Sequence, residues 1–421
     1  MDGRNDCDRL FIRRGYNMIL GVEIENFDVF DKDLSGILIE ESVRIAKEKK
    51  AGSKESGRNR FRNLNALVGR NSTGKTSFMG CLSFLQDVIS EGCAEASIIK
   101  GRPGFANMSP DISKPSVFRV FFKLEDIVTG KPKYVQYEIG IGASVYKSPF
   151  ICFEKILTSE YQGDELKVVP LLDVKEGKGS ISYPGAVNGD MGEVVLDDEH
   201  LPALSIYGKL GKYVDFVALS REIGNWFFCS FSSDVQNTYF NEGGAPGGHK
   251  HLNSLGSNVG NVLEYMKQRD EAEYERIISE IKTKIPAMKN KKNLPEVLRE
   301  SPDKLFLYLL LLRDGTPRST IFIETPDKDL YHDMVDVLAD EMRTYTLTNG
   351  YCQIIFSTHN PYIIETLSPK EVWIFERTFE KESGDISIRC AGDDPLVCEM
   401  FRQGVGMGAI WYAGHLDSDP E

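Results

Sequence analysis

Residues 69–76, with the sequence GRNSTGKT, constrain the fold of this chain more than any other feature. They fit the pattern G-x-x-x-x-G-K-[ST] without a mismatch, between a predicted strand at 64–68 and apolar residues at helical spacing at 77–89. Glycine at both ends lets the backbone turn so that successive N–H groups converge on a phosphate, and the following helix N-terminus adds partial positive charge. The flanking strand and helix favour such a phosphate-binding loop (P-loop) over a glycine-rich turn that only resembles one.

This loop predicts a nucleotide site in an α/β fold. Lys75 is expected to reach the β- and γ-phosphates as a catalytic residue, and the Thr76 hydroxyl is expected to ligate Mg²⁺. The predicted cofactors are therefore ATP and Mg²⁺. We expect nucleotide contacts from Gly69, Arg70, Asn71, Ser72, Thr73, Gly74, Lys75, Thr76 and Ser77.

Two later strand ends carry side chains that this chemistry needs. A P-loop requires an acid at the end of a neighbouring strand to hold the metal, and Glu324, which ends the apolar segment 320–324, is the candidate. Its apolar neighbours disfavour the alternative, a surface acid. The predicted strand at 352–357 is followed by His359, on a turn fixed by Pro361. We expect this imidazole to face the γ-phosphate as a catalytic residue rather than to serve the structure alone.

The remaining patterns predict both strands and helices. Period-2 alternation indicates a strand at 18–30 and further strands across 117–157, and the polar segment 166–204 is typical of hairpins. Apolar residues at helical spacing predict three helices, at 261–284, 302–313 and 331–344. The last helix lies between the two late strands and therefore indicates a parallel crossover.

The composition disfavours several classes of protein. With 50 Lys and Arg against 63 Asp and Glu, the net charge is −13, which argues against a uniformly basic nucleic-acid binder. The charged segment 44–62 is either a solvated face or a surface that faces an anion or a partner. The longest apolar run, 305–312, is far shorter than the ~20 residues of a membrane-spanning helix, so we expect no membrane partner.

Two further features predict a cytoplasmic location. The first 14 residues are charged and lack the apolar segment of a secretion signal. Eight scattered cysteines form no CxxC pair, which indicates free thiols in a reducing compartment.

The motifs together resemble a known group of proteins. GRNSTGKTS, IFIETPDKDLYH and IIFSTHNPYIIETL are similar to the ABC-type ATPase heads of the RecF, SMC and OLD group. More narrowly, the chain resembles a family of bacterial AAA-type ATPases, whose further motifs match residues 221–226, 247–252 and 411–416. The likeness spans residues 19–416. Relatives of this kind include the ATPase subunits of two-component anti-phage systems, in which the ATPase works with a nuclease.

The resemblance implies a P-loop ABC-type ATPase head with a mixed-sheet lobe and a helical or insertion lobe. It suggests four parts: an N-terminal ATPase lobe (1–165), an insertion or helical lobe (166–300), the C-terminal part of the ATPase core (301–380) and a C-terminal extension (381–421). It also implies an ATP-dependent homodimer or higher oligomer, with a nuclease or other effector, or DNA, as further partners.

One departure from the family pattern concerns the general base. The family's acidic strand end carries a metal ligand and then a base before proline. Aligned on Pro326, Glu324 is the metal ligand and Thr325 stands at the base position. Threonine does not accept a proton from water near neutral pH, so we expect slow hydrolysis, with Asp327 the nearest substitute.

A second departure concerns the signature that an ABC-type head presents to the facing subunit's γ-phosphate. Its best match by order is Ser301 and Asp303, where Asp303 replaces a glycine and sets a carboxylate beside the phosphate. The segment 252–258 contains a competing S-x-G, which family order assigns to a separate motif. For His249 and His251 we expect a structural or phosphate-facing role rather than metal binding.

These features favour an ATP hydrolase that dimerises around ATP and switches an effector or a DNA-associated complex, in anti-phage defence. Two alternatives stay open: a hydrolysis-deficient, ATP-locked scaffold for a nuclease or toxin, and a RecF-like DNA-repair ATPase. A transporter ATPase is disfavoured because the chain has no LSGGQ-like signature. A nuclease in its own right is disfavoured because no cluster of paired acids follows Arg377.

Overall fold

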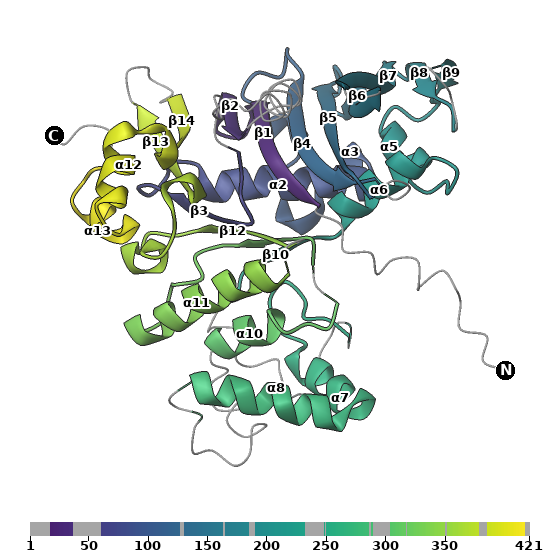
Figure 1. Ribbon diagram of the computed structural model, residues 1–421. Helices are drawn as coiled ribbons and strands as arrows, with labels where there is room; N and C mark the ends of the chain where they lie inside the picture. Colours follow the sequence, from purple (N-terminus) through teal and green to yellow (C-terminus); the bar gives the residue numbers. More distant parts are fainter. Residues whose placement is uncertain are drawn as a thin grey trace.

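The chain folds around two β-sheets and several groups of helices (Figure 1). This architecture is the predicted α/β class, with a mixed sheet and a helical layer. The computed structural model describes residues 17–36, 60–126, 130–162, 165–184, 190–231, 248, 250–285, 288, 304–316, 318–349, 352–378 and 385–416.

The smaller sheet contains the strand that precedes the P-loop. Its order is β10-β11-β12-β3-β13-β14, and all neighbours pair in parallel except β13 and β14. The strands are β3 (Leu64–Val68), β10 (Trp226–Cys229), β11 (Thr320–Ile323), β12 (Gln353–Ser357), β13 (Val372–Thr378) and β14 (Asp385–Cys390). Because β3, β11 and β12 are parallel, their carboxyl ends meet at one edge of the sheet.

Each face of this sheet packs on a different core. Successive residues of a strand point to opposite faces. Phe322 and Ile355 belong to the core shared with the larger sheet, whereas Ile321 and Ile354 belong to the core on the helical side. Burial on both faces explains why these strands are nearly continuous apolar runs.

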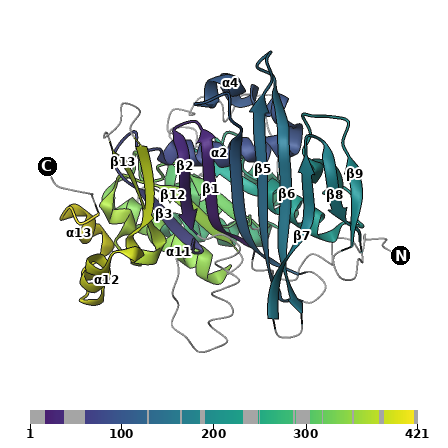
Figure 2. The same ribbon diagram turned by 90° about the horizontal axis from the view of Figure 1, so that it is seen from above.

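The larger sheet is antiparallel throughout, in the order β2-β1-β4-β5-β6-β7-β8-β9. Its strands are β1 (Met18–Phe27), β2 (Phe30–Gly36), β4 (Ser116–Glu125), β5 (Pro132–Ala143), β6 (Pro149–Gln162), β7 (Glu165–Lys175), β8 (Lys178–Ser182) and β9 (Met191–Val195). Figure 2 shows them side by side. The hairpins predicted within 166–204 are confirmed by β7, β8 and β9.

Five α-helices lie in the described ranges up to residue 224: α2 (Lys75–Glu91), α3 (Cys93–Ala96), α4 (Phe105–Met108), α5 (Ala203–Tyr207) and α6 (Val214–Gly224). The longest, α2, begins directly after the P-loop and runs beneath the larger sheet (Figure 1). Its Phe84 stacks on Phe27 of β1, with ring centroids 4.8 Å apart. This packing holds the middle of α2 against the sheet.

The α-helices described after residue 224 are α7 (Val259–Arg269), α8 (Glu271–Lys284), α10 (Lys304–Leu311), α11 (His332–Thr348), α12 (Pro395–Arg402) and α13 (Met407–Tyr412). In Figure 1, α7, α8, α10 and α11 form a layer below the smaller sheet. Every residue of α10 is buried, as its apolar sequence predicts. The predicted crossover is confirmed, because α11 joins the parallel strands β11 and β12.

The prediction of one strand at 18–30 is wrong, because this segment turns between β1 and β2. Asn26 and Asp28 adopt positive φ angles of 55° and 52°. The Asn26 side-chain amide donates hydrogen bonds to the carbonyl oxygens of Asp111, at 2.8 Å, and Lys114, at 3.0 Å. These bonds hold Asn26 in a backbone conformation that a continuous strand excludes.

The single helix predicted at 261–284 is also divided. Asp270 takes an extended conformation, with φ −157°, between α7 and α8. Its carboxylate accepts a hydrogen bond from the backbone N–H of Glu273 at 3.0 Å and so caps the start of α8. The sequence signal for two helices was therefore Asp270, a residue type that caps helices, within an otherwise continuous helical pattern of apolar residues.

Three further predictions concern the domain division, membrane-spanning helices and the cysteines. The four-part division of the chain stays a prediction, and β6 and β7 pair within one sheet across the suggested boundary at 165. No helix in the described ranges has the length and apolarity needed to cross a membrane. The seven described cysteines are free thiols, and Cys7 lies outside the described residues.

Candidate functional site

The loop between β3 and α2 has the backbone shape that the P-loop pattern requires. Gly69, Ser72 and Gly74 have positive φ angles of 144°, 63° and 94°. A Cβ atom added to Gly69 would lie 2.2 Å from the carbonyl oxygen of Phe375, so only glycine fits there. The turn therefore depends on the two glycines that define the pattern.

The Lys75 side chain lies beneath this loop and is nearly fully buried. Its Nζ donates hydrogen bonds to the carbonyl oxygens of Gly69 and Arg70, both at 2.7 Å, and to the hydroxyl of Thr73 at 3.3 Å. Burial lowers the pKa of the Lys75 ammonium to about 8. The cation is thus fixed at the centre of the loop, where it is available to exchange its carbonyl partners for phosphate oxygens.

The predicted metal ligands lie in contact. The Thr76 hydroxyl, in the first turn of α2, donates a short hydrogen bond to Oε1 of Glu324. Glu324 follows β11, and its backbone N–H donates to the carbonyl oxygen of Cys229 at the end of β10, at 3.3 Å. A hydroxyl and a carboxylate beside a phosphate-binding loop form the all-oxygen donor set that Mg²⁺ takes together with nucleotide phosphates. The residues present therefore fit a magnesium ion.

His359 lies against the same loop. It follows β12, and its ring hydrogen-bonds to the backbone of Gly69. Partial desolvation and the nearby Lys75 charge lower the pKa of His359, while Asp327 and the Gly69 bond oppose that shift. The structure thus brings together Lys75, Glu324 and His359, which come from three strand ends of one sheet.

The turn after Glu324 shows what occupies the expected position of the general base. Thr325 has a φ of 40°, and its backbone N–H donates to the hydroxyl of Ser357 at 3.2 Å. The nearest carboxylate along the chain, Asp327, accepts a hydrogen bond from the Thr358 hydroxyl at 2.8 Å. Burial raises the pKa of Asp327. A threonine therefore stands beside the metal ligand, with one hydrogen-bonded acid two residues further on.

Two basic residues that lie at the site were not predicted to belong to it from the sequence. Lys304, at the start of α10, is buried and donates to the carbonyl oxygens of Thr325, at 3.2 Å, and Lys328, at 2.8 Å. Arg377 of β13 donates to the carbonyl oxygen of Ser72 in the P-loop, at 3.4 Å. The signal for Lys304 was a lone charge at the head of an entirely apolar helix, because such a charge needs a polar partner.

Several predicted residues cannot be placed. Ser301 and Asp303 lie outside the described residues, as do His249 and most of the charged segment 44–62. His251 is described, and its Nδ1 hydrogen-bonds to Oδ2 of Asp314 at 2.7 Å. No group of three or more His, Cys, Asp or Glu side chains suited to a metal occurs in the part of the chain that the structure describes.

The competing S-x-G segment at 252–258 forms a turn before α7. Asn258, at its end, is fully buried and donates through its side-chain amide to the carbonyl oxygens of Gly248, at 2.6 Å, and His251, at 2.9 Å. The Asn253 side chain accepts from the backbone N–H of Ser257 at 3.0 Å. These bonds give the segment a structural role within one chain.

Comparison with known protein families concerns the part of the site that follows β11 and β12. Residues 303–365 match a family described as "AAA domain, putative AbiEii toxin, Type IV TA system". The matched segment contains both Glu324 and His359. No curated protein matches the sequence. The P-loop and the matched segment together give the chain the nucleotide-binding site of a P-loop ATPase.

Similar solved structures include heads of SMC proteins and a RecF protein. The SMC head domain from Thermotoga maritima is 11% identical, with a TM-score of 0.35 over 87% of this chain and 97% of that one. The Smc head from Pyrococcus furiosus, bound to the C-terminal domain of ScpA, is 13% identical, with a TM-score of 0.36 over 92% and 100%. The recombination mediator RecF is 9% identical, with a TM-score of 0.33 over 88% and 98%.

Proposed function

We propose that this chain is an ATPase that binds ATP and Mg²⁺ at the P-loop and turns ATP over slowly. The observation that carries the proposal is the convergence on one loop of three predicted residues distant in sequence. Glu324 contacts Thr76, and His359 contacts Gly69 beside Lys75. A strand-end acid beside a P-loop can hold the metal ion, and a nearby imidazole can stabilise charge on the transferred phosphate.

The residues divide the work by their chemistry. Thr76 and Glu324 would hold Mg²⁺, which neutralises charge on the phosphates and polarises them when bound. Lys75 would give up its bonds to the loop carbonyls and donate to phosphate oxygens instead. His359 would stabilise the terminal phosphate or report its presence, because its ring already lies at the loop.

Slow turnover follows from the residue at the base position. Thr325 offers a hydroxyl that stays protonated near neutral pH, and its oxygen is too weakly basic to take a proton from the attacking water. Asp327 is the substitute we propose, since it lies in the same turn and its raised pKa makes it a stronger base than an exposed aspartate. Its bond to Thr358 orients the carboxylate but occupies one oxygen.

We further propose that two copies close around ATP, with Ser301 and Asp303 of one copy facing the nucleotide of the other. This part rests on the resemblance to ABC-type heads. The proposed cytoplasmic location rests on the scattered cysteines, of which the seven described ones are free thiols. The output would be conformational and delivered to a nuclease, to another effector or to DNA. The family matched at 303–365 is described by a putative toxin of a toxin–antitoxin system, which supports a role in defence over one in repair.

A phosphate-release assay tests the enzymatic proposal. The unaltered chain should release phosphate from ATP in a Mg²⁺-dependent manner, and Lys75→Ala should abolish both nucleotide binding and release while the far-UV circular dichroism is unchanged. Equal ATP affinity in the two proteins would contradict the assignment of the site. Light scattering with and without ATP then tests the dimer.

Thr325 also supports a second candidate, an ATP-locked scaffold. In that case ATP binds and assembles the complex, but turnover is absent. ATP-dependent dimerisation together with phosphate release no faster than that of Lys75→Ala would select the scaffold. Turnover that Lys75→Ala removes would select the ATPase.

A further inference from the structure

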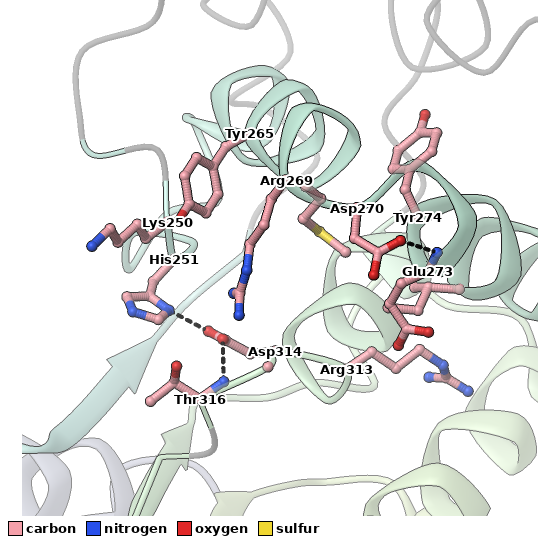
Figure 3. Close-up of a pocket in the computed structure, with 13 residues that line it drawn as sticks. Lys250, His251, Tyr265, Arg269, Asp270, Glu273, Tyr274, Arg313, Asp314 and Thr316 are labelled. Carbon is pink, nitrogen blue, oxygen red and sulfur yellow. Dashed lines mark hydrogen bonds and ion pairs between the residues drawn. The ribbon is translucent and has the colours of Figure 1, made fainter. Parts of the chain in front are cut away.

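A cavity of about 670 Å³ lies on the helical side of the molecule, away from the P-loop (Figure 3). Its floor is the loop 313–316, which leads from α10 to the amino end of β11. Glu324 follows the carboxyl end of the same strand, so the full length of β11 separates the cavity from the nucleotide site. The volume lies within the range of pockets that hold small organic ligands, about 300–1,000 Å³.

The walls of the cavity come from two helices and the segment before them. Tyr265, Met266 and Arg269 come from α7, and Tyr274 and Ile277 come from α8. The break at Asp270 separates the two helices, and Figure 3 shows the Arg269 side chain extending from α7 into the space above Asp314. The cavity therefore offers aromatic and apolar surface together with a guanidinium group.

The floor is held in place by ion pairs on its outer side. Arg313 donates through Nη2 to Glu280 of α8 and to Glu341 of α11, both at 2.7 Å. Lys284 also pairs with Glu341. The Arg313 charge is thus balanced by the protein itself and is not available to a ligand.

The carboxylates that line the cavity also accept hydrogen bonds from other groups of the protein. Asp314 bonds to Nδ1 of His251 at 2.7 Å and accepts from the backbone N–H of Thr316 at 3.0 Å. Asp270 caps α8 through the N–H of Glu273, at 3.0 Å, and the Glu273 carboxylate accepts two bonds from Arg276, at 2.7 and 2.8 Å. Each lining acid therefore already has a donor.

The two remaining charged side chains that line the cavity, Lys250 and Arg269, are both cations. Neither Lys250 nor Arg269 forms a hydrogen bond or an ion pair with any residue in the described ranges. Both side chains are exposed, and Tyr265 lies between them in Figure 3. Two uncommitted positive charges beside an aromatic ring match a doubly charged anion with a planar part better than a singly charged carboxylate.

We propose that this cavity binds a small organic phosphate, up to the size of a mononucleotide. The phosphate lies at the Arg269 guanidinium, with Lys250 at the rim beyond Tyr265, and the planar part lies on Tyr265 and Met266. Arg269 supplies a forked pair of N–H donors and Lys250 a point charge, and proteins use both to bind phosphate. No residue of the P-loop lines this cavity, so binding here is independent of the proposed ATPase activity.

Calorimetric titration of the full chain with AMP tests the proposal. The titration uses the Lys75→Ala variant, in which AMP does not bind at the P-loop. If that variant does not fold, the unaltered chain is used instead. We expect saturable binding of AMP and none of adenosine, which lacks the phosphate. Arg269→Gln should weaken AMP binding by about tenfold or more, because it removes a charge-assisted forked contact.

Lys267→Gln is the matched control, because Lys267 also lies in the last turn of α7, pairs with Glu271 and is not part of the lining. It should leave the AMP affinity unchanged. Absence of AMP binding, equal binding of adenosine, or equal affinities in Arg269→Gln and Lys267→Gln would each overturn the proposal. Binding of N-acetylglutamate in place of AMP would overturn it too, by assigning the cavity to carboxylates.

Discussion

The hydroxyl of Thr76, in the first turn of α2, donates a hydrogen bond to the carboxylate of Glu324, which lies 248 positions later in the sequence. The contact forms because β3 and β11 are parallel strands of one sheet, separated only by β12, and end at the same edge. The two oxygen groups meet where a nucleotide on the P-loop would place its terminal phosphates.

Changing Glu324 to glutamine tests the metal site. Gln keeps an oxygen that accepts from Thr76 but removes the negative charge, so we expect the Mg²⁺ concentration for half-maximal ATP binding to rise by at least about tenfold. A fluorescent ATP analogue titrated with Mg²⁺ measures this. Asp329→Asn is the control, because it removes an exposed charge from the same turn and asparagine tolerates the φ of 67° found there. An equal Mg²⁺ requirement in both variants would exclude Glu324 as a ligand.

The pKa of Lys75 predicts how nucleotide binding depends on pH. Burial lowers this pKa from 10.5 to about 8, so between those values the folded chain holds fewer protons than the unfolded chain. The Lys75 contribution to the free energy of unfolding therefore rises with pH across this window. Phosphate oxygens favour the charged ammonium, so nucleotide binding above pH 8 must take up a proton.

Calorimetry at about pH 8.5, in buffers of different ionisation enthalpy, measures that proton uptake. We expect net uptake by the unaltered chain and little by Lys75→Arg, because a guanidinium stays charged at this pH. Equal uptake in the two proteins would show that another group titrates.

The convergence of the candidate site residues could be predicted from the sequence because each part of the site is a local pattern. The P-loop needs two glycines at fixed spacing, and Glu324 and His359 each follow a short apolar strand. That these ends meet follows from the parallel crossover alone. Distance along the chain therefore did not weaken the prediction.

The features that were missed depend on tertiary partners. The turn at Asn26 requires acceptors from residues 111 and 114, and nothing near Asn26 in the sequence indicates them. The sequence does not indicate what Lys304 binds, because its two acceptors belong to a turn more than twenty residues later. The hydrogen bond from Arg377 likewise joins β13, the last parallel strand along the chain, to the loop that follows β3, the first one.

Introducing a carboxylate at position 325 tests why turnover is slow. If the missing general base limits the rate, Thr325→Glu should speed phosphate release by about 100-fold, the lower end of what general base catalysis contributes. Thr325→Gln is the matched control, since it has the same length and branching but cannot accept the proton. Equal rates in the two variants would place the limitation elsewhere, for example in the signature region or in product release.

Replacing Lys304 by methionine tests what holds the turn after Glu324. The Lys304 ammonium bonds to the carbonyl oxygens of Thr325 and Lys328, and the turn includes two residues with positive φ, Thr325 and Asp329. Backbone in that conformation persists only where neighbours hold it. We expect Lys304→Met to lower the free energy of unfolding by about 1 to 2 kcal/mol, because the partly buried carbonyl oxygens of Thr325 and Lys328 lose their donor.

Urea denaturation measures that loss, with Lys328→Met as the control, because Lys328 lies in the same turn and is exposed. The control should change the free energy of unfolding by less than about 0.5 kcal/mol. Phosphate release per folded molecule should also fall in Lys304→Met, since Glu324 and Asp327 flank the loosened backbone. A stable variant with unchanged release would show that the turn keeps its shape without Lys304, and that burial of the apolar stem compensates for the lost bonds.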